Sequence, residues 1–380
     1  MIPFNKPYLT GKETQYIQQA VQSGKISGNG VFTAKCHRYF KKEFGFSDVF
    51  LTTSCTDALE MAALLIETGP GDEIIMPAYT FVSTANAFVL RGARIIFVDS
   101  TEQSPHLDPD QIESVITPKT KAIVPVHYAG IACDMDKIMS LAERHGLFVI
   151  EDAAQSVNSY HQTRPLGSIG HFGAFSFHET KNVIAGEGGM LAVNDGRYAK
   201  RAEIIWEKGT NRAEFFRGEV KKYEWVDLGS SYLPSELTAA FLYAQLEHLK
   251  EIQARRQSIW ERYYSELKIL ESRERLRLPE IPDYATNNGH LFYLVSRDLS
   301  ERDGLLAHLL ENGILAVFHY LSLHTSPYYR NRHDGRQLPW SEYYSQRLVR
   351  LPLFYELTDD QVSHIIQSVL DFYSLSAVFS

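Results

Sequence analysis

Lys181 and Asp152 each lie near the end of a short apolar run, 29 positions apart in the chain. Lys181 belongs to the segment Ser176–Asn182, and Asp152 directly follows the apolar run Leu147–Glu151. Pyridoxal phosphate needs such a pair, because an amine must bind its aldehyde as a Schiff base and a carboxylate must keep its ring nitrogen protonated. The protonated ring then withdraws electrons from the substrate carbon. The two residues therefore predict an enzyme that uses pyridoxal phosphate, with Lys181 and Asp152 as catalytic residues.

Both residues also have a simpler interpretation. Lys181 could be a solvated loop lysine, and Asp152 could cap a helix that follows it. The glycine-rich stretch Gly186–Gly189 favours a functional lysine, since glycine lets the backbone approach a bound molecule closely. In a partly desolvated pocket the pKa of a lysine falls, and the neutral amine is the nucleophile that forms the Schiff base.

A cofactor phosphate would be bound by the segment Thr53–Ala58, which joins an expected strand to an amphipathic helix. Small hydroxyl residues at a helix start usually cap the helix. The same geometry points free backbone amides at an anion, so Cys55 could donate its N–H and Thr56 its hydroxyl. Ser176, five residues before Lys181, is a further candidate donor.

The cofactor ring needs two more contacts, one polar and one aromatic. Gln155, three residues after Asp152, could donate a hydrogen bond to the phenolic oxygen. Phe81, in the segment after Met76-Pro77, could stack on the ring, and we prefer it to Tyr79. The alternative is that an aromatic residue here only fills the space between sheet and helix.

The elements that must position these residues form an α/β pattern between residues 49 and 195. Short runs rich in Ile, Val and Phe, typical of strands covered on both faces, alternate with helical patterns. The expected strands are Val49–Thr53, Glu73–Pro77, Arg94–Val98, Ala122–Val126, Leu147–Glu151, Gly173–Phe177 and Gly189–Val193, and the expected helices include Thr56–Thr68 and Met135–Gly146. This alternation predicts a mostly parallel, doubly wound sheet, with ligands bound beyond the carboxyl ends of its strands.

A second, smaller unit is expected after the sheet. Ser235–Lys268 contains no Gly or Pro and predicts one long helix, or a helix with a break, that connects two domains. The later expected elements are strands at His290–Ser296 and Ile314–Tyr320, a helix between them, and a terminal helix over about 358–373. We therefore expect a large cofactor-binding α/β domain at residues 1–250 and a small C-terminal α+β domain at residues 251–380.

Composition limits the classes of partner. The 380 residues carry a net charge of −8 and no block of Lys or Arg, which argues against nucleic-acid or membrane-surface binding. No signal peptide and no apolar run long enough to span a bilayer are recognised, so a cytoplasmic protein is expected. Cys36, Cys55 and Cys133 have unrelated spacings, and no Cys-x-x-Cys or His-Glu-x-x-His pattern indicates a metal.

These motifs together resemble those of the DegT/DnrJ/EryC family of sugar aminotransferases, which are fold type I pyridoxal phosphate enzymes acting on nucleotide-linked keto-sugars. The similarity covers nearly the whole chain, from Ile2–Phe4 and Ser23–Gly28 to Leu351–Leu353 and Leu357–Gln361. Within the family, the chain looks most like the members that make dTDP-4-amino-4,6-dideoxygalactose for enterobacterial common antigen. The segments that carry this finer resemblance are Met76–Gly92, Pro125–Gly130, Ser176–Asn182 and Glu207–Arg212.

The resemblance implies roles for the matched positions. Lys181 would be the Schiff-base lysine and the proton shuttle, and Asp152 would pair with the ring nitrogen. The other implied roles are the phenolic oxygen for Gln155, the phosphate for Thr56 and Ser176, and ring stacking for Phe81. Where the family commonly has an asparagine donated by the second subunit, this chain has Ser231, so a homodimer with shared active sites is expected.

The resemblance also implies a reaction. The amino group of L-glutamate would move to C4 of dTDP-4-dehydro-6-deoxy-D-glucose, giving dTDP-4-amino-4,6-dideoxy-D-galactose for surface polysaccharides such as O-antigen lipopolysaccharide. A gluco product or a 3-keto sugar substrate is the nearest alternative. Arg212 is a candidate anchor for the glutamate carboxylate, and His319 and Tyr320 are candidates for nucleotide binding, with simple packing as their alternative.

Enzymes of other classes fit the sequence less well. A pyridoxamine-dependent dehydratase of this family would have histidine in place of Lys181. A nucleotide reductase of the Rossmann type would need Gly-x-Gly-x-x-Gly after the first strand, and this chain lacks it. A non-enzymatic interaction protein would not require the Lys181–Asp152 pair.

Overall fold

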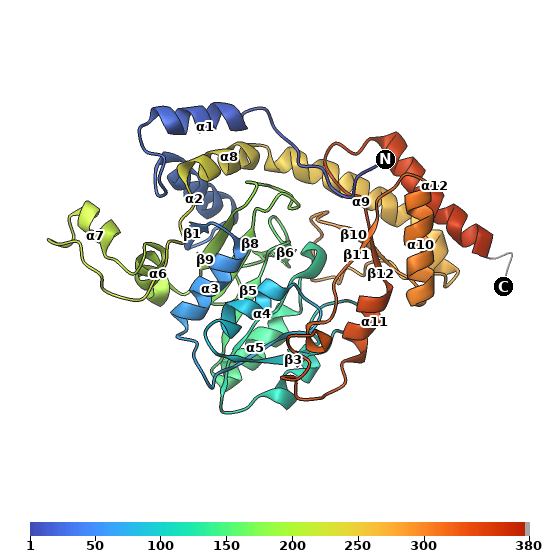
Figure 1. The fold of residues 1–380 in the computed structure, drawn as a ribbon, viewed down its shortest axis with the longest axis horizontal. Coiled ribbons are helices and arrows are strands. Elements are labelled where there is room, and N and C mark those ends of the chain that lie inside the picture. The colour runs from blue at the N-terminus through green and yellow to red at the C-terminus, as the bar shows by residue number, and fades with distance from the viewer. Residues whose placement is uncertain (377–380) are drawn as a thin grey trace.

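The central feature of the fold is a seven-stranded sheet, seen in a computed structural model that describes residues 1–376 (Figure 1). Its strand order is β1-β9-β8-β5-β4-β2-β3. The strands are β1 (Asp48–Thr52), β2 (Glu73–Pro77), β3 (Arg94–Val98), β4 (Thr120–Ile123), β5 (Phe148–Asp152), β8 (Phe172–Ser176) and β9 (Gly189–Val193). Only β9 among them runs against its two neighbours, so the carboxyl ends of the others meet at one edge.

Both faces of this sheet are covered by helices, because its strands are apolar on both sides. Ile74 and Met76 join one core with helices α3 (Cys55–Leu65), α4 (Val82–Val89) and α6 (Ala199–Trp206). Ile75, between them, points to the opposite face and packs with α5 (Met135–His145). Helices α2 (Val31–Phe44) and α8 (Glu236–Glu247) cover the rest of that second face, and α1 (Glu13–Gln22) packs on α8. The predicted doubly wound α/β architecture is confirmed.

All seven expected strands form, and β4 differs most from its expected bounds. It ends at Ile123, whereas the apolar pattern extended to Val126. Pro125 has no N–H to donate, which interrupts the ladder, and Val126 then forms only an isolated bridge with Asp152. The pattern of apolar residues therefore located the strand but not its end.

A second core lies beyond the sheet and is reached along α9 (Leu249–Ser272), which Figure 1 shows running from α8 toward the small sheet. The expected long helix is broken at His248, whose backbone is non-helical, and continues four residues past Lys268 to Ser272. A small antiparallel sheet of order β10-β12-β11 is formed by β10 (Phe292–Val295), β11 (Val317–Phe318) and β12 (Leu348–Leu351). Its core partners include α10 (Leu299–Glu311), α12 (Asp359–Ser376) and Ile2 near the N-terminus.

The remaining elements are peripheral to the two cores. They are the hairpin β6 (Tyr160–His161) and β7 (Arg164–Pro165), helix α7 (Arg212–Arg217), helix α11 (Pro339–Arg347) and five short 3-10 turns. Leu323, Tyr329 and Leu338 pack back against the core of the large sheet. The expected domain boundary between residues 250 and 251 stays a prediction.

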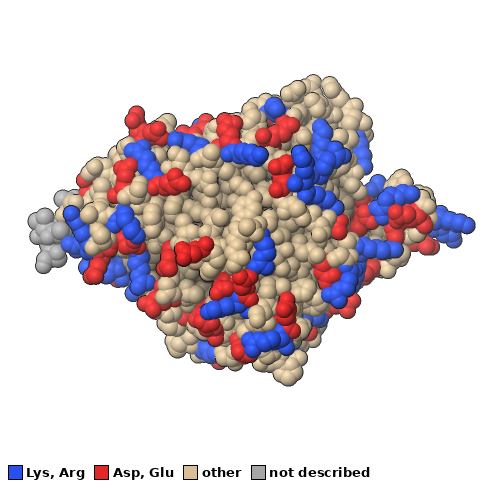
Figure 2. All heavy atoms as spheres, turned by 180° about the vertical axis from the view of Figure 1, so that it is seen from behind, with Lys and Arg blue, Asp and Glu red and all other residues tan. Residues whose placement is uncertain are grey.

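The surface carries mixed charge. Figure 2 shows acidic and basic side chains interspersed over the face turned away in Figure 1. Within residues 1–376, no helix is both long enough and apolar enough to cross a bilayer. The same residues contain no group of three or more His, Cys, Asp or Glu side chains arranged to hold a metal ion.

Candidate active site

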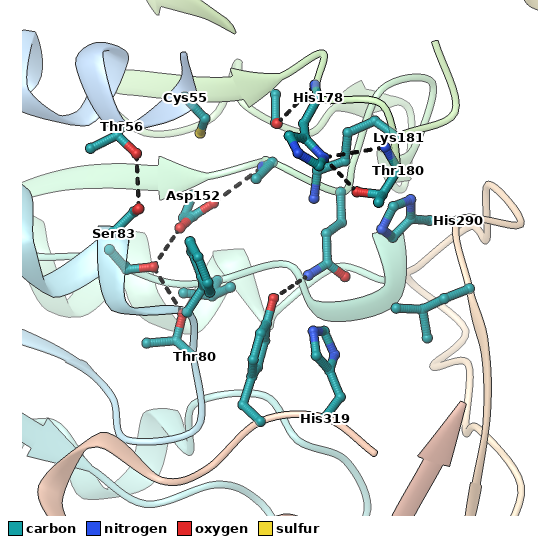
Figure 3. Close-up of a pocket in the computed structure, with 18 of the residues that line it drawn as sticks. Cys55, Thr56, Thr80, Ser83, Asp152, His178, Thr180, Lys181, His290 and His319 are labelled. Atoms are coloured by element: carbon teal, nitrogen blue, oxygen red, sulfur yellow. Dashed lines mark hydrogen bonds between the residues drawn. The ribbon is translucent and has the colours of Figure 1, made fainter. Parts of the chain in front are cut away.

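A cavity of about 1010 Å³ lies where the carboxyl ends of the large sheet face the small sheet. Its walls come from the segments after β1, β2, β5 and β8, and from β12 and the segment around His319. Figure 3 shows Asp152, Lys181, His290 and His319 around this common space, each from a different segment of the chain. Residues from both ends of the chain line it, including Phe4 and Leu353.

Lys181 lies in the turn that follows β8, with its backbone N–H bonded to the carbonyl of His178 at 2.9 Å. Its Nζ forms no hydrogen bond or ion pair with any other part of residues 1–376. Removal from water lowers the pKa of this amine, while Cys55 and Asp152 act in the opposite direction. The amine therefore loses its proton more readily than a solvated lysine and has no protein partner. Nucleophilic attack requires both.

Asp152 is the last residue of β5 and is buried beside the cavity. Its Oδ2 accepts a hydrogen bond of 2.7 Å from the Thr84 hydroxyl, and its Oδ1 accepts one of 3.1 Å from the N–H of Ala154. Because Thr84 gives its proton to Asp152, Thr80 must be the donor in the 2.9 Å contact between the two threonines. This chain of donors orients the carboxylate. Burial raises the pKa of Asp152, and the bonds from Thr84 and Ala154 oppose that rise.

The helix-cap interpretation of Asp152 is wrong. Residues 153–159 form non-helical turns, so there is no helix start for the carboxylate to cap. Gln155 still lines the cavity. Its Oε1 accepts a 2.7 Å hydrogen bond from the N–H of Ala129, which leaves the NH₂ group toward the cavity, 3.4 Å from the Tyr320 hydroxyl. The amide therefore presents a donor, which suits a phenolic oxygen.

The start of α3 lines the cavity and offers a candidate anion cradle. Ser54 caps the helix by accepting a 3.1 Å bond from the N–H of Asp57, and Cys55 and Thr56 begin the first turn. Amides of a first helical turn have no carbonyl four residues earlier to bond, so they are free to bind an anion. The Thr56 hydroxyl contacts the Ser83 hydroxyl at 2.8 Å, and Ser176 lines the same cavity.

Gly189 allows this cradle to sit against the sheet. It pairs with Thr52 of β1 and Ser176 of β8 at the edge where the cavity opens. A Cβ at this position would lie 2.3 Å from the backbone carbon of Ser54 and 2.5 Å from the backbone nitrogen of Cys55. The absence of a side chain is therefore a steric requirement of the helix start.

Of the two aromatic candidates for ring stacking, Phe81 lines the cavity and Tyr79 does not. Phe81 is 54% exposed at the start of α4, whereas Tyr79 is 1% exposed and packs on Tyr128, Tyr320 and Tyr344. An exposed aromatic face beside an empty volume is the arrangement that a flat ligand can use.

His319 and Tyr320 also line the cavity, on the side of the small sheet. The Tyr128 hydroxyl and His319 Nδ1 are 2.9 Å apart. Burial, with help from the charges of Arg350 and Lys181, holds the pKa of His319 well below its usual range, so the ring is neutral. These two residues offer neutral, aromatic surface.

Arg212 and Ser231 do not reach the cavity of their own chain. Arg212 Nη1 bonds Glu207 Oε2 at 2.9 Å, and Ser231 is an exposed residue that pairs with the backbone of Glu207. Figure 1 shows α7, which begins at Arg212, projecting from the body of the molecule. The predicted roles of both residues would need a second subunit, and they stay predictions.

Comparison with known proteins decides the family. The sequence model of the DegT/DnrJ/EryC1/StrS aminotransferase family matches residues 7–370. This chain belongs to that family. It is 33% identical over 379 residues to the spore coat polysaccharide biosynthesis protein SpsC of Bacillus subtilis, a match that covers 97% of this chain and 96% of SpsC.

Solved structures agree with this assignment. The aminotransferase TlmJ from Streptoalloteichus hindustanus has a TM-score of 0.90 and 30% identity, covering 100% of both chains. DesV from S. venezuelae, solved with a ketimine intermediate, has a TM-score of 0.89 and 30% identity, covering 98% of each chain. Spr1654 from Streptococcus pneumoniae, solved in its PLP form, has a TM-score of 0.90 and 26% identity, covering 98% of each chain. The predicted fold type I architecture, aminotransferase activity and cofactor are confirmed.

The cavity of this DegT-family aminotransferase fits pyridoxal phosphate on its own chemistry. It contains an unpartnered amine, a buried oriented carboxylate, an outward amide donor and a helix start with adjacent hydroxyls. These groups match the aldehyde, ring nitrogen, phenolic oxygen and phosphate of the cofactor.

Among the cavity residues that sequence reasoning missed are His290 and Arg350. Asn182 donates to Gln253 at 2.7 Å and to the carbonyl of Asn288 at 2.9 Å, so its oxygen must accept the 2.9 Å bond from His290 Nδ1. Burial holds the pKa of His290 well below its usual range, so the neutral ring carries its proton on Nδ1 and has a lone pair on Nε2. Arg350 went unnoticed because β12 was not predicted. The run Leu348-Val349-Arg350-Leu351, apolar except for one charged residue, is the signal that could have indicated the strand.

Proposed function

We propose that this sugar aminotransferase transfers the amino group of L-glutamate to C4 of dTDP-4-dehydro-6-deoxy-D-glucose, giving dTDP-4-amino-4,6-dideoxy-D-galactose. The observation that carries the proposal is the unpartnered Lys181 amine in one cavity with the oriented Asp152 carboxylate. The choice of sugar rests on the resemblance of Met76–Gly92 and Glu207–Arg212 to the corresponding segments of enzymes with that product.

Lys181 and Asp152 would share the chemical work. Pyridoxal phosphate, when bound, supplies the electron sink that makes a carbon-bound proton labile. Lys181 would hold the cofactor aldehyde until the amino group of glutamate displaces it, and the freed amine would then take the α-proton of glutamate and later deliver a proton to C4 of the sugar. Its lowered pKa favours the neutral, proton-accepting form. Asp152 keeps the ring nitrogen protonated.

The other candidates would hold and orient the cofactor. The Cys55 N–H and the hydroxyls of Thr56 and Ser176 would bind its phosphate at the α3 start. Gln155 would donate to the phenolic oxygen, and Phe81 would stack on the ring. Each contact reduces the freedom of the ring relative to Lys181, so that one amine can serve both half-reactions.

The sugar nucleotide would occupy the remainder of the cavity. A volume of about 1010 Å³ is at the upper end of ligand sites, roughly 300–1,000 Å³, and leaves space beyond the cofactor. His319 and Tyr320 are proposed to contact the nucleotide part through their neutral aromatic faces. The face of C4 turned toward Lys181 would decide between galacto and gluco products.

A homodimer with shared active sites is part of the proposal. The arm around α7 exposes large apolar side chains, with Phe216 71% and Trp225 80% exposed. Burial of such side chains against a second copy would be favourable. It would also bring Ser231, and with it Arg212, to the partner's cavity.

We propose that the enzyme acts in the cytoplasm, where glutamate and nucleotide-activated sugars are available, and that its product enters a surface polysaccharide. The relationship to a spore coat polysaccharide biosynthesis protein supports a polysaccharide pathway. An O-antigen, lipopolysaccharide or enterobacterial common antigen destination is the specific form of this proposal.

Product analysis tests the proposed reaction. The purified enzyme, loaded with pyridoxal phosphate, should change its absorbance near the visible edge on addition of L-glutamate. It should then aminate dTDP-4-dehydro-6-deoxy-D-glucose in preference to 3-keto and other nucleotide sugars, and proton NMR should report an axial amine at C4. An equatorial amine or a preference for a 3-keto sugar would refute the proposed product.

A further inference from the structure

Arg350 is a cationic side chain that projects from the small sheet into the active-site cavity. It lies on β12, between Tyr293 of β10 and Val317 of β11, and lines the same cavity as Lys181. Its Nη2 donates one 3.3 Å hydrogen bond to the carbonyl of Phe318. The Nε is buried and has no hydrogen-bond partner within the described part of the chain.

No acid of residues 1–376 lies within ion-pair distance, 4.0 Å, of this guanidinium. The titratable groups that interact electrostatically with it are the phenols of Tyr79, Tyr128 and Tyr320, together with Lys181, His290 and His319. Burial lowers the pKa of Arg350, and the three tyrosines oppose that change. A partly buried cation with no counter-charge is costly, so the site is suited to bind an anion.

The aromatic ring of Phe4 stabilises the Arg350 guanidinium when no anion is bound. The Arg350 Cζ lies 4.6 Å from the centroid of this ring, within the range of a cation–π contact. Phe4 also lines the cavity. The guanidinium can therefore be partly compensated before a carboxylate arrives and after it leaves.

Two anions would enter this cavity under the proposed function: the carboxylates of the amino donor and the diphosphate of the sugar nucleotide. The α-carboxylate is bonded to the carbon that loses its proton, so it must lie beside Lys181. The diphosphate is separated from the reacting C4 by the width of the sugar ring. Arg350 is linked to the part of the cavity that carries Lys181. Asn182, the neighbour of Lys181, bonds His290. His290 lies three residues before Tyr293, which is the strand partner of Arg350.

We propose that Arg350 binds the α-carboxylate of the amino donor and serves only the amino-acid half-reaction, returning to Phe4 while the sugar reacts. The proposal rests on the proposed function and names the donor anchor for it. A guanidinium holds a carboxylate through two parallel N–H···O bonds, and the unpaired Nε supplies one of them. On this assignment Arg212, whose guanidinium already bonds Glu207, is not the anchor.

The two half-reactions can be measured separately in R350Q. The rate of cofactor conversion by L-glutamate at subsaturating concentration should fall roughly 10- to 100-fold, as expected when a charge-assisted carboxylate bond is lost. Conversion by the amino sugar in the reverse direction should stay within threefold of wild type. R350K should give an intermediate loss for glutamate, because an ammonium cannot make the paired bonds. R347Q is the control, since Arg347 bonds the Arg297 carbonyl and stacks on Tyr343 outside the cavity.

A binding measurement gives a readout that does not depend on turnover. Glutarate, an unreactive five-carbon dicarboxylate, should bind the cofactor-loaded wild type and R347Q in calorimetry, and should bind R350Q at least tenfold more weakly. Equal glutarate binding by R350Q and wild type, or a loss seen instead in R212Q, would overturn the assignment. So would equal losses in both half-reactions of R350Q, which would indicate a general structural role.

Failure of the proposed function has a different signature. If glutamate does not convert the wild-type cofactor but glutarate binding still depends on Arg350, the donor is another carboxylate-bearing amine and the anchor stands. If the wild type uses glutamate and the same glutamate concentration saturates R350Q, the proposed function stands and Arg350 is not the carboxylate anchor. If R350Q does not fold, R350K retains the charge and decides the question by the same two measurements.

Discussion

Gly189→Ala is the perturbation whose effect follows most directly from the geometry. The added methyl group would lie 2.3 Å from the Ser54 carbon, 2.4 Å from the Ser54 oxygen and 2.5 Å from the Cys55 nitrogen. All three are backbone atoms and cannot rotate away. Since ordinary van der Waals contacts begin at 3.4 Å, the start of α3 must move by about an ångström. Overpacking of this kind costs about 1–3 kcal/mol.

The displaced segment is the proposed phosphate cradle, so cofactor binding should weaken as well. A shift of about an ångström would break at least one charge-assisted hydrogen bond from the Cys55 or Thr56 segment, worth about 1.5–3 kcal/mol. That corresponds to a roughly 10- to 100-fold rise in the Kd for pyridoxal phosphate. Equilibrium titration of the apoenzyme, followed by absorbance, measures it, and thermal unfolding of the apoenzyme measures the packing cost separately.

Gly196→Ala is the matched control. A Cβ at Gly196 meets no atom within 4 Å, and its backbone does not require a positive φ. Both cofactor affinity and unfolding temperature should be unchanged. If G189A binds the cofactor within threefold of wild type and unfolds at the same temperature, the close approach of β9 to α3 does not restrict position 189 to glycine.

Three further predictions concern the amine, the acid and the arm. K181A should lose transamination by at least about 10³-fold while the apoenzyme keeps its fold, and substantial turnover would contradict the role of Lys181. Thr84→Val removes a hydrogen bond that lowers the pKa of Asp152, so that pKa should rise further. The acid limb of the pH–rate profile should then move to higher pH. An unmoved limb would count against the orienting role of Thr84. W225E should shift the protein toward monomer in analytical ultracentrifugation, since it puts a charge on the exposed apolar arm; an unchanged sedimentation coefficient would exclude this arm from the interface.

Local patterns predicted the large sheet well because each strand is apolar on both faces. Glu73–Pro77, Arg94–Val98 and Gly189–Val193 form strands with the expected bounds. The predicted bounds were wrong where a local feature interrupted the apolar pattern. Pro125 ends β4 early, and His248 breaks the long helix. The small sheet was harder, because β11 has only two residues and a charged residue interrupts the apolar run of β12.

The candidate site divides in the same way. Lys181, Asp152, Gln155, Cys55, Thr56, Ser176 and Phe81 were named from the sequence, and all line one cavity. They follow strands whose carboxyl ends share one edge, and this rule needs only the strand directions. Arg212 was proposed from its loop alone, and a buried partner, Glu207, holds it elsewhere.

The sequence by itself determined the sheet, the chemistry of the pair Lys181 and Asp152, and the family, because these depend on residue types and on short-range apolar patterns. The tertiary structure decided what surrounds that pair. Arg350 is 169 positions from Lys181, and it enters the same cavity only because the small sheet packs over the edge of the large one. The need for glycine at 189 likewise arises from a contact with Ser54, far away in the chain. Such contacts depend on how distant elements pack, and no local pattern encodes them.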